Sequence, residues 1–237
     1  YQPEAYLSVS DTYIEKDLAI NQEVDKLRLR ATSNLLSGRR DIIVVASVSC
    51  IYGMGNPEDY KAGIIRIQKG ETISRNAFLY RLVESLYSRT EGQLGRGNFR
   101  VKGDTVDISL PYVDYGYRIS FYGDVIEEID IIDINTGQRH EPLEHAAIFP
   151  ANLYVAPKDR LKFVIRDIED ELFAQEEYFT REKKYLEAKR IHERTTFDLE
   201  MIRELGYCSG VENYSRFFDG RAQGTRPFCL LDYFPDD

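Results

Sequence analysis

The feature that most restricts the fold is a series of short alternating runs between residues 98 and 137. Apolar and polar residues alternate in NFRVKGDTVDISL and again in YRISFYGDVIEEIDIIDINTGQR. Turn signals interrupt the runs at Gly103-Asp104, at Gly123-Asp124 and at residues 135–137. Alternation with a period of two is typical of half-buried strands, and glycine beside a polar residue is typical of hairpin turns. The pattern predicts an antiparallel meander that closes near Pro150.

A helix with a strong apolar face precedes the meander. Ser74 is a suitable N-cap, because its hydroxyl can accept a hydrogen bond from the free backbone N–H groups of a first helical turn. Apolar residues then recur on one helical face, at Phe78, Leu79, Leu82, Val83, Leu86 and Tyr87. One helix with several antiparallel strands makes residues 62–150 an α+β domain, inserted into a different surrounding fold.

The segment before this domain has the features of an α/β fold. Helical spacing connects Ile20, Val24, Leu27, Ala31 and Leu35, and Gly38 follows where a helix would end. The charged residues Lys26, Arg28 and Arg30 fall on other faces and are expected to face solvent. The run DIIVVASVSC from Asp41 then predicts a strand buried on both faces, as in a parallel sheet.

Helices dominate the remainder of the chain. Apolar spacing predicts one helix through Leu161, Ile165, Ile168 and Leu172, and a second through Leu186, Phe197, Met201, Ile202 and Leu205. Gly206 would end the second helix, so we expect an antiparallel helix pair. The last stretch, rich in aromatics and glycine, predicts loops and a final strand at 228–231.

Composition excludes several classes of protein. The 237 residues are 43% hydrophobic and 30% charged, which suits one large domain or two ordinary domains of a soluble globular protein. No apolar run is long enough to span a bilayer, and no signal peptide is visible. The three cysteines lack the spacing of zinc sites or disulfides, so we expect a reducing cytoplasm. The net charge of −9 argues against coating nucleic acid through bulk positive charge, although a wedge of aromatics is compatible with it.

No nucleotide-binding or catalytic motif stands out. The chain has neither GxxxxGKS nor GxxxxGKT, so we expect it neither to bind nor to hydrolyse ATP. Carboxylates cluster at Asp124, Glu127, Glu128, Asp130 and Asp133, and again at Asp232, Asp236 and Asp237. A two-metal nuclease needs carboxylates that converge on one point, whereas neighbours on a strand point to alternate faces. We therefore predict no catalytic residues and no metal site.

Basic residues gather on one side of the predicted meander. In FRVKG, Arg100 and Lys102 alternate with apolar residues and therefore point to the same face of the strand. Arg118 has an equivalent position in the next hairpin. Guanidinium groups on one face of an acidic protein suit an acidic partner surface, although a merely solvated sheet face fits this pattern equally well. Because Arg100 points away from the core, its replacement by glutamate is expected to leave the fold intact.

Six segments, spread from the first residue to the last, carry a family signature. They are YQPEAY, SDTYIEKD, VASVSCIYGMG, GNFRVKGD, RTTFDLEMIRELGYCSGVENYSR and LLDYFPDD. Together they closely resemble the UvrB family of bacterial nucleotide excision repair. The resemblance implies an internal fragment, without the phosphate loop and the DExH strand of the helicase-like parent. It divides the chain into a hairpin remnant with part of a helicase-like (P-loop NTPase-type) α/β domain at 1–61, an inserted UvrA-interaction domain at 62–150, and a helical lobe with a return to the helicase-like domain at 151–237.

The resemblance gives the N-terminal tyrosines a role. In the UvrB family a tyrosine-rich β-hairpin passes between the two DNA strands, and YQPEAY resembles its later part. The DNA-binding residues implied here are Tyr1, Glu4, Tyr6 and Tyr13. Unburied rings can replace the base stacking that is lost when strands are parted. Because the chain starts inside this motif, we expect a lone hairpin strand, disordered or refolded.

The resemblance also implies partners. Arginines on the sheet of the interaction domain dock onto UvrA in this family. The matching residues here are Arg89, Arg100, Lys102 and Arg118. Two positions depart from the family pattern: Lys102 replaces a forked guanidinium with a point charge, and Ser120 replaces an acidic residue, so that an ion pair is lost. The fragment would need no cofactor and no membrane, whereas its parent would use ATP with Mg and bind damaged DNA and UvrC.

Two alternatives stay open at this point. One is the related UvrA-binding module of a transcription-repair coupling factor, a pure protein adaptor, against which YQPEAY and CSGVENYSR argue. The other is a free-standing metal-dependent nuclease that would use the acidic clusters. A cleavage assay on plasmid DNA with divalent metal separates the nuclease from both binding proteins.

Overall fold

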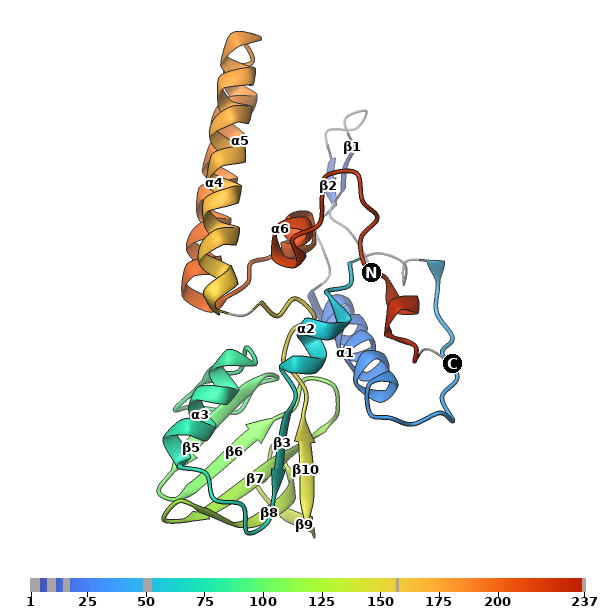
Figure 1. The fold of residues 1–237 in the computed structure, drawn as a ribbon, viewed down its shortest axis with the longest axis vertical. Coiled ribbons are helices and arrows are strands. Elements are labelled where there is room, and N and C mark those ends of the chain that lie inside the picture. The colour runs from blue at the N-terminus through green and yellow to red at the C-terminus, as the bar shows by residue number, and fades with distance from the viewer. Residues whose placement is uncertain (1–4, 8–11, 15–17, 49–52, 157, 236–237) are drawn as a thin grey trace.

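The computed structural model describes residues 5–7, 12–14, 18–48, 53–156 and 158–235 (Figure 1). An N-terminal region with helix α1, a middle domain built on a six-stranded sheet, and a long antiparallel helix pair follow one another along the chain. The helix pair extends away from the middle domain, so the molecule is elongated (Figure 1). No helix within the described ranges is long and apolar enough to cross a membrane.

The N-terminal region begins with a short two-stranded ribbon. Strand β1 (Ala5–Leu7) pairs antiparallel with β2 (Thr12–Ile14), and Tyr6 lies opposite Tyr13. The expectation of a lone hairpin strand was wrong, because these two segments satisfy each other's backbone hydrogen-bonding groups. Tyr1 and Glu4 lie outside the described residues.

Helix α1 (Leu18–Leu35) forms as predicted but buries a different side. Its buried residues include Leu29, Thr32 and Leu35. Leu27, expected in the core, keeps 54% of its surface exposed. Lys26 is buried, so the prediction that it faces solvent was wrong; an ion pair with Asp114 of the middle domain compensates for its burial.

Residues 41–48 do not form the predicted strand. The side chains of this segment still alternate between the core and solvent. Ile42 and Val44 contact the core, whereas Ile43 and Val45 are 91% and 94% exposed. A strand of a parallel sheet needs neighbouring strands, and within the described ranges no strand pairs with this segment. Residues 41–48 therefore have the sequence of a strand but no neighbouring strand in the described ranges to pair with.

The middle domain is built on a six-stranded sheet with the order β4-β5-β6-β7-β8-β9. Its strands are β4 (Ser88–Arg89), β5 (Asn98–Lys102), β6 (Thr105–Ser109), β7 (Tyr115–Tyr122), β8 (Val125–Asp133) and β9 (Arg139–Pro142). The β5–β6, β7–β8 and β8–β9 hairpins turn where the glycine signals placed them, and only the β4–β5 pair is parallel. The predicted antiparallel meander is confirmed.

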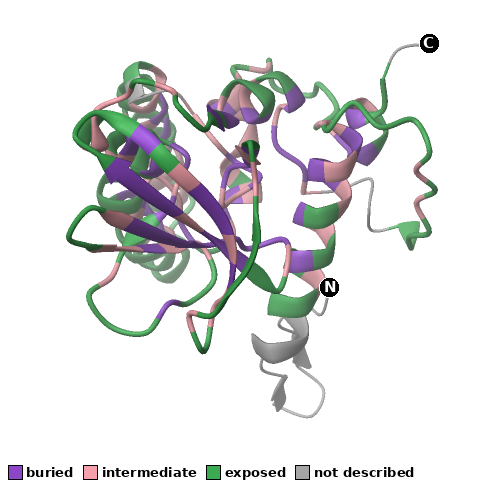
Figure 2. Cartoon of the chain, turned by 90° about the horizontal axis from the view of Figure 1, so that it is seen from below, coloured by how far each residue is buried: buried purple, intermediate pink, exposed green. Residues whose placement is uncertain are grey.

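One face of this sheet is apolar and packs against helix α3 (Arg75–Glu84) (Figure 1). The central strands of the sheet are largely buried (Figure 2). Ser74 caps the helix as predicted, because its hydroxyl accepts from the N–H of Ala77 at 3.2 Å. Phe78 is fully buried, and its ring centroid lies 5.7 Å from that of Phe121 on β7. The other face of the sheet carries the polar side chains of the same strands and is described below.

Helices α4 (Lys158–Arg181) and α5 (Tyr185–Leu205) form the predicted antiparallel pair (Figure 1). Gly206 ends α5 with φ 81°, a left-handed conformation in which a side chain would be strained. Leu186 and Phe197 were predicted to pack inward, but they are 56% and 61% exposed. Each helix of a two-helix pair buries one stripe, so apolar residues outside that stripe stay on the surface.

Three short helical segments follow the pair. They are η2 (Val211–Tyr214), α6 (Ser215–Asp219) and η3 (Leu230–Tyr233). The strand predicted at 228–231 was wrong, because η3 begins there. Asp232 accepts from the backbone N–H of Cys229 at 2.7 Å and from Arg226 at 2.6 Å, which caps a helical turn at this point.

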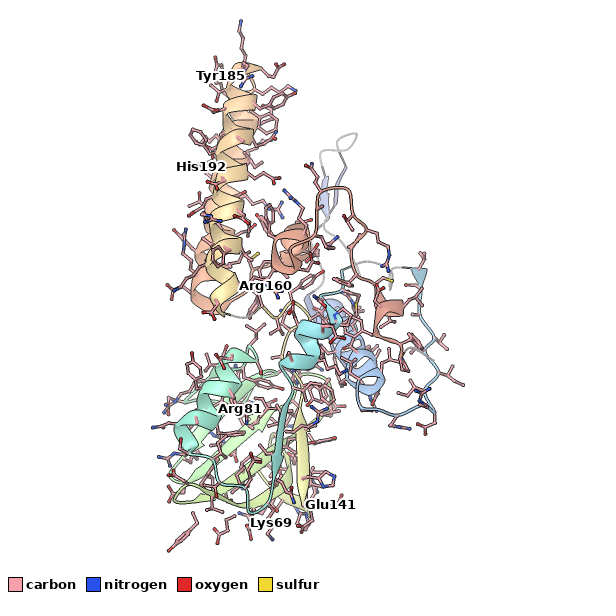
Figure 3. The ribbon with its side chains drawn as sticks, viewed as in Figure 1. Lys69, Arg81, Glu141, Arg160, Tyr185 and His192 are labelled. Atoms are coloured by element: carbon pink, nitrogen blue, oxygen red, sulfur yellow. The ribbon has the colours of Figure 1, made fainter. Side chains whose placement is uncertain are left out.

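The three regions meet at a compact junction. Helix α2 (Pro57–Ala62) leads into strand β3 (Ile65–Gln68), and β10 (His145–Ile148) returns antiparallel to β3. Arg160, near the start of α4, donates to Asp59 of α2 at 2.6 Å and so ties the helix pair to this entry point (Figure 3).

A chain of charges fastens α1 to the middle domain. Lys26 pairs with Asp114, and Arg96 donates to Glu23 at 3.1 Å. Lys26 Nζ also lies 3.6 Å from Glu23 Oε1, which links the two pairs. The hydrogen bond from Lys26 lowers the pKa of the Asp114 carboxyl below its ordinary value.

Asp114→Asn is expected to lower the free energy of unfolding by about 1 kcal/mol at neutral pH, because it leaves the buried ammonium of Lys26 with only the more distant Glu23. The Asp114 pKa is lowered in the folded chain. Its contribution is therefore present above the unfolded pKa of about 3.9 and is lost as the pH falls through the folded pKa. Urea unfolding of both proteins at pH 7 and near pH 3 measures this, and a difference that does not shrink in acid would contradict it.

Candidate docking face

The polar face of the six-stranded sheet carries a row of charges across four strands. The row consists of Arg100 on β5, Asp107 on β6, Arg118 on β7 and Asp130 on β8, which are register partners in consecutive strand pairs. Arg139 on β9 extends it, because its Nη1 lies 3.3 Å from Asp130 Oδ2. Positive and negative side chains alternate along this row, so each carboxylate lies between two guanidinium groups.

Asp107 is the more deeply buried of the two anions of this row, with a side chain that is 3% exposed. Arg118 donates to it through Nε at 2.6 Å and through Nη2 at 2.9 Å, and Arg100 Nη2 donates at 3.2 Å. Burial by itself raises the pKa of this carboxyl, but the hydrogen bonds and charges of Arg118 and Arg100 outweigh burial and lower the pKa. Asp107 therefore stays ionised and fixes both guanidinium groups.

The two arginines are anchored and do not project freely. Arg100 also donates to the carbonyl of Gly92 and Arg118 to that of Gly137, both at 3.3 Å. Their side chains are only 20% and 21% exposed. The expectation that Arg100→Glu leaves the fold intact rests on a projecting side chain, and the structure contradicts that premise, since a glutamate there would face Asp107. A partner would meet preorganised guanidinium edges, which lowers the entropy lost on binding.

The remaining predicted docking residues differ in position. Lys102 lies on the polar face two residues after Arg100 and is exposed. Arg89 is the register partner of Phe99, which faces the core, so Arg89 does not belong to the row. Its guanidinium pairs instead with Glu91 at 3.0 Å. The structure therefore brings together Arg100, Lys102 and Arg118, and separates Arg89 from them.

The N-terminal tyrosines form a second candidate site. Tyr6 and Tyr13 are paired in the β1–β2 ribbon. This ribbon lies away from the six-stranded sheet, on the far side of α1 and α2 from it (Figure 1). A partner bound at the polar face and a strand of DNA at the ribbon would thus occupy separate parts of the chain.

The acidic clusters noted in the sequence have other partners. Asp133 accepts from the backbone N–H groups of Asn135 and Thr136 and so closes its own turn. Glu128 accepts from Arg139 at 2.9 Å. Among the residues that the structure describes, no three histidine, cysteine or acidic side chains are grouped to hold a metal ion.

Comparisons with known proteins agree with this architecture. The model of the UvrB interaction domain matches residues 65–154, and that of the UvrB third helical domain matches residues 159–220. The chain belongs to the UvrB family. UvrABC system protein B of Bacteroides fragilis is 62% identical over 237 residues, which is all of this chain and 35% of that protein. The protein of the same name is 60% identical in Cytophaga hutchinsonii, with 35% of its length covered, and 51% identical in Chlorobium phaeobacteroides, with 34% covered. The chain thus spans about a third of the length of these curated relatives.

The polar face lies wholly within the UvrB interaction domain. Sequence reasoning found its basic residues but missed Asp107 as their shared partner, together with Asp130 and Arg139. A signal was available, because the turn at Gly103-Asp104 sets the register of β5 against β6, and counting back from it places Asp107 opposite Arg100.

Proposed function

We propose that this part of a UvrB-family protein docks onto UvrA through the polar face and probes DNA through the β1–β2 ribbon during nucleotide excision repair. The row of fixed charges supports the docking role, since two arginines are held in place by a buried carboxylate within the UvrB interaction domain. Fixed charges favour orientation and selection of a partner more than raw affinity.

The DNA-probing role is assigned to Tyr1, Glu4, Tyr6 and Tyr13. Pairing of Tyr6 with Tyr13 supports it, because a narrow ribbon with aromatic residues can pass between separated strands. Stacking on an aromatic ring is worth about 1–3 kcal/mol per base. With a net charge of −9, binding of this chain to intact duplex should be weak.

The longer protein would supply what this chain lacks. It would be a cytoplasmic, helicase-like ATPase subunit that uses ATP with Mg, loads onto damaged DNA and works with UvrC. The chain itself would only bind, since its sequence has no phosphate loop.

Lys102→Glu is expected to weaken binding of the chain to UvrA from the same organism by roughly tenfold or more, because it reverses an exposed charge on the polar face. The same reversal at Lys69, exposed in the turn after β3, is the control and should change affinity less than twofold. Calorimetric titration measures both, with thermal melts to show that both variants fold. Failure of the unaltered chain to bind UvrA would overturn the docking role itself.

A further inference from the structure

Two residues other than glycine have a left-handed backbone in the described part of the chain, Leu86 with φ 66° and Lys183 with φ 59°. Each stands one residue beyond the cap of a helix, in a bonding pattern that glycine usually completes. After α3, the N–H of Tyr87 donates to the carbonyl of Leu82 at 3.0 Å. The N–H of Leu86 donates to the carbonyl of Val83, also at 3.0 Å. A leucine costs more free energy than a glycine in this conformation, so a contact of its side chain is expected to offset the strain.

The side chain of Leu86 meets the helix pair. Leu86 is half-buried, yet the described apolar residues that pack against the hydrophobic core do not include it. Its Cδ2 instead lies over the backbone of Gly206, the left-handed glycine that ends α5, because a Cβ built there would be 2.9 Å from it. In Figure 1, α3 lies next to the end of the helix pair that is nearest the middle domain. The leucine of one region thus sits on the glycine of another.

The residues on either side of Leu86 are fixed within the middle domain. The carbonyl of Ser85 accepts from the N–H of Ala151 at 2.9 Å. The buried hydroxyl of Tyr87 donates to the carbonyl of Phe149 at 2.8 Å. Leu86 therefore projects from a rigid base, and its position reports the orientation of the whole middle domain.

Next to this contact, the boundary between α3 and α4 is open. A cleft of about 650 Å³ lies there, lined by residues that include Arg81 and Ser85 from the α3 side and Asp159 and Lys162 of α4 (Figure 3 labels Arg81). A cleft of this size with polar walls admits water. Since α3 and α4 are not packed together at this place, the middle domain has room to turn once the Leu86 contact is lost.

We propose that Leu86 is a latch, which holds the middle domain in one orientation by seating its side chain on Gly206 at the end of the helix pair. The latch sets the direction of the polar face relative to α4 and α5. When the leucine leaves its seat, the middle domain turns about the junction and the cleft changes shape. This inference goes beyond the proposed function, because the orientation is a property of the chain without any partner.

Distance measurements on the full chain test the latch. Spin labels carried by genetically encoded amino acids replace Asp124 in the β7–β8 turn and Arg190 on α5, both exposed, and leave the three cysteines unmodified. Double electron–electron resonance should give one narrow distance peak for the chain with Leu86. Leu86→Gly keeps the helix end but removes the side chain, so a broad distribution should replace the narrow peak. Lys183→Gly is the matched control at the other left-handed position, and it should keep the narrow peak while raising the melting temperature by about 2 °C through relief of strain.

A second pair of variants blocks the seat instead of removing the latch. Gly206→Ala places a Cβ against Leu86 Cδ2, the end of a side chain that can swing aside, so the latch should open while the chain stays folded. The distance distribution should broaden as in Leu86→Gly. Gly220→Ala is the control, because Gly220 also has a left-handed backbone, with φ 68°, but nothing lies within 4 Å of a Cβ there. It should keep the narrow peak.

Three results would overturn the latch. One is a narrow peak in Leu86→Gly, when thermal melts show that this variant is folded. Another is an equal distribution in Gly206→Ala and Gly220→Ala, and the third is a broad distribution in the chain that keeps both Leu86 and Gly206. UvrA takes no part in these measurements, so their failure would leave the docking role standing.

Discussion

Replacing Asp107 with alanine is expected to lower the free energy of unfolding of the middle domain by about 3 kcal/mol. Removal of one partner from a buried ion pair leaves the other charge uncompensated, at a typical cost of about 3–5 kcal/mol. Here Arg100 and Arg118 would be left side by side without the anion that both bind. The lower end of the range is expected because each arginine keeps a fifth of its side chain in contact with solvent.

The control for Asp107→Ala is Asp104→Ala, in the turn between β5 and β6. Asp104 pairs with Arg75 at 3.0 Å, but its side chain is 80% exposed, so its loss should cost less than about 1 kcal/mol. Hydrogen exchange of the β5, β6 and β7 amides, with urea unfolding of the full chain, measures both variants. Equal losses of stability in the two variants would mean that the buried carboxylate does not organise the polar face.

Acid provides an independent check on Asp107. Its pKa is lowered in the folded chain, so its contribution is present above the unfolded value of about 3.9 and is lost as the pH falls through the lower folded value. The stability difference between the unaltered chain and Asp107→Ala should therefore shrink below about pH 4. The proposed docking onto UvrA should weaken over the same range, because Arg100 and Arg118 lose the anion that positions them.

The parts of the fold that sequence predicted correctly depend on local signals. Ser74 caps its helix through an atom three residues away, and the glycine turns connect strands that are adjacent in the chain. Gly206 ends α5 through its own backbone conformation. Each of these features is decided within one turn of chain, so a single sequence contains the necessary information.

The errors arose where distant residues decide the outcome. The run at 41–48 has the composition of a buried strand, but within the described ranges no strand pairs with it. Lys26 is buried because Asp114, far along the chain, lies beside it. The sequence analysis treated the polar face as basic because it considered only the basic residues, whereas the structure places Asp107 and Asp130 opposite the arginines.

Gly55→Ala is expected to destabilise the junction of the three regions by about 2–3 kcal/mol. A Cβ at this position would overlap the backbone carbonyl of Leu153, which cannot rotate away as a side chain could. The carbonyl of Gly55 also accepts from the hydroxyl of buried Tyr233 at 3.1 Å, so a shift of this backbone breaks a second contact. Overpacking typically costs about 1–3 kcal/mol, and the smaller entropy of the unfolded alanine chain offsets only about 0.4–1 kcal/mol of it.

Gly92→Ala is the matched control, because the nearest atom to a Cβ there, Oγ1 of Thr90, is 3.8 Å away. This substitution should leave the melting temperature within about 2 °C of the original, since 1 kcal/mol corresponds to roughly 2–4 °C in a chain of this size. Gly55→Ala should lower it by about 5–10 °C by the same conversion, measured as loss of helical circular dichroism. A melting temperature for Gly55→Ala equal to that of Gly92→Ala would show that neither the Leu153 carbonyl nor the Tyr233 hydrogen bond restricts the space at Gly55. The middle domain and the helix pair would then be joined through Arg160 and Asp59 without close backbone packing.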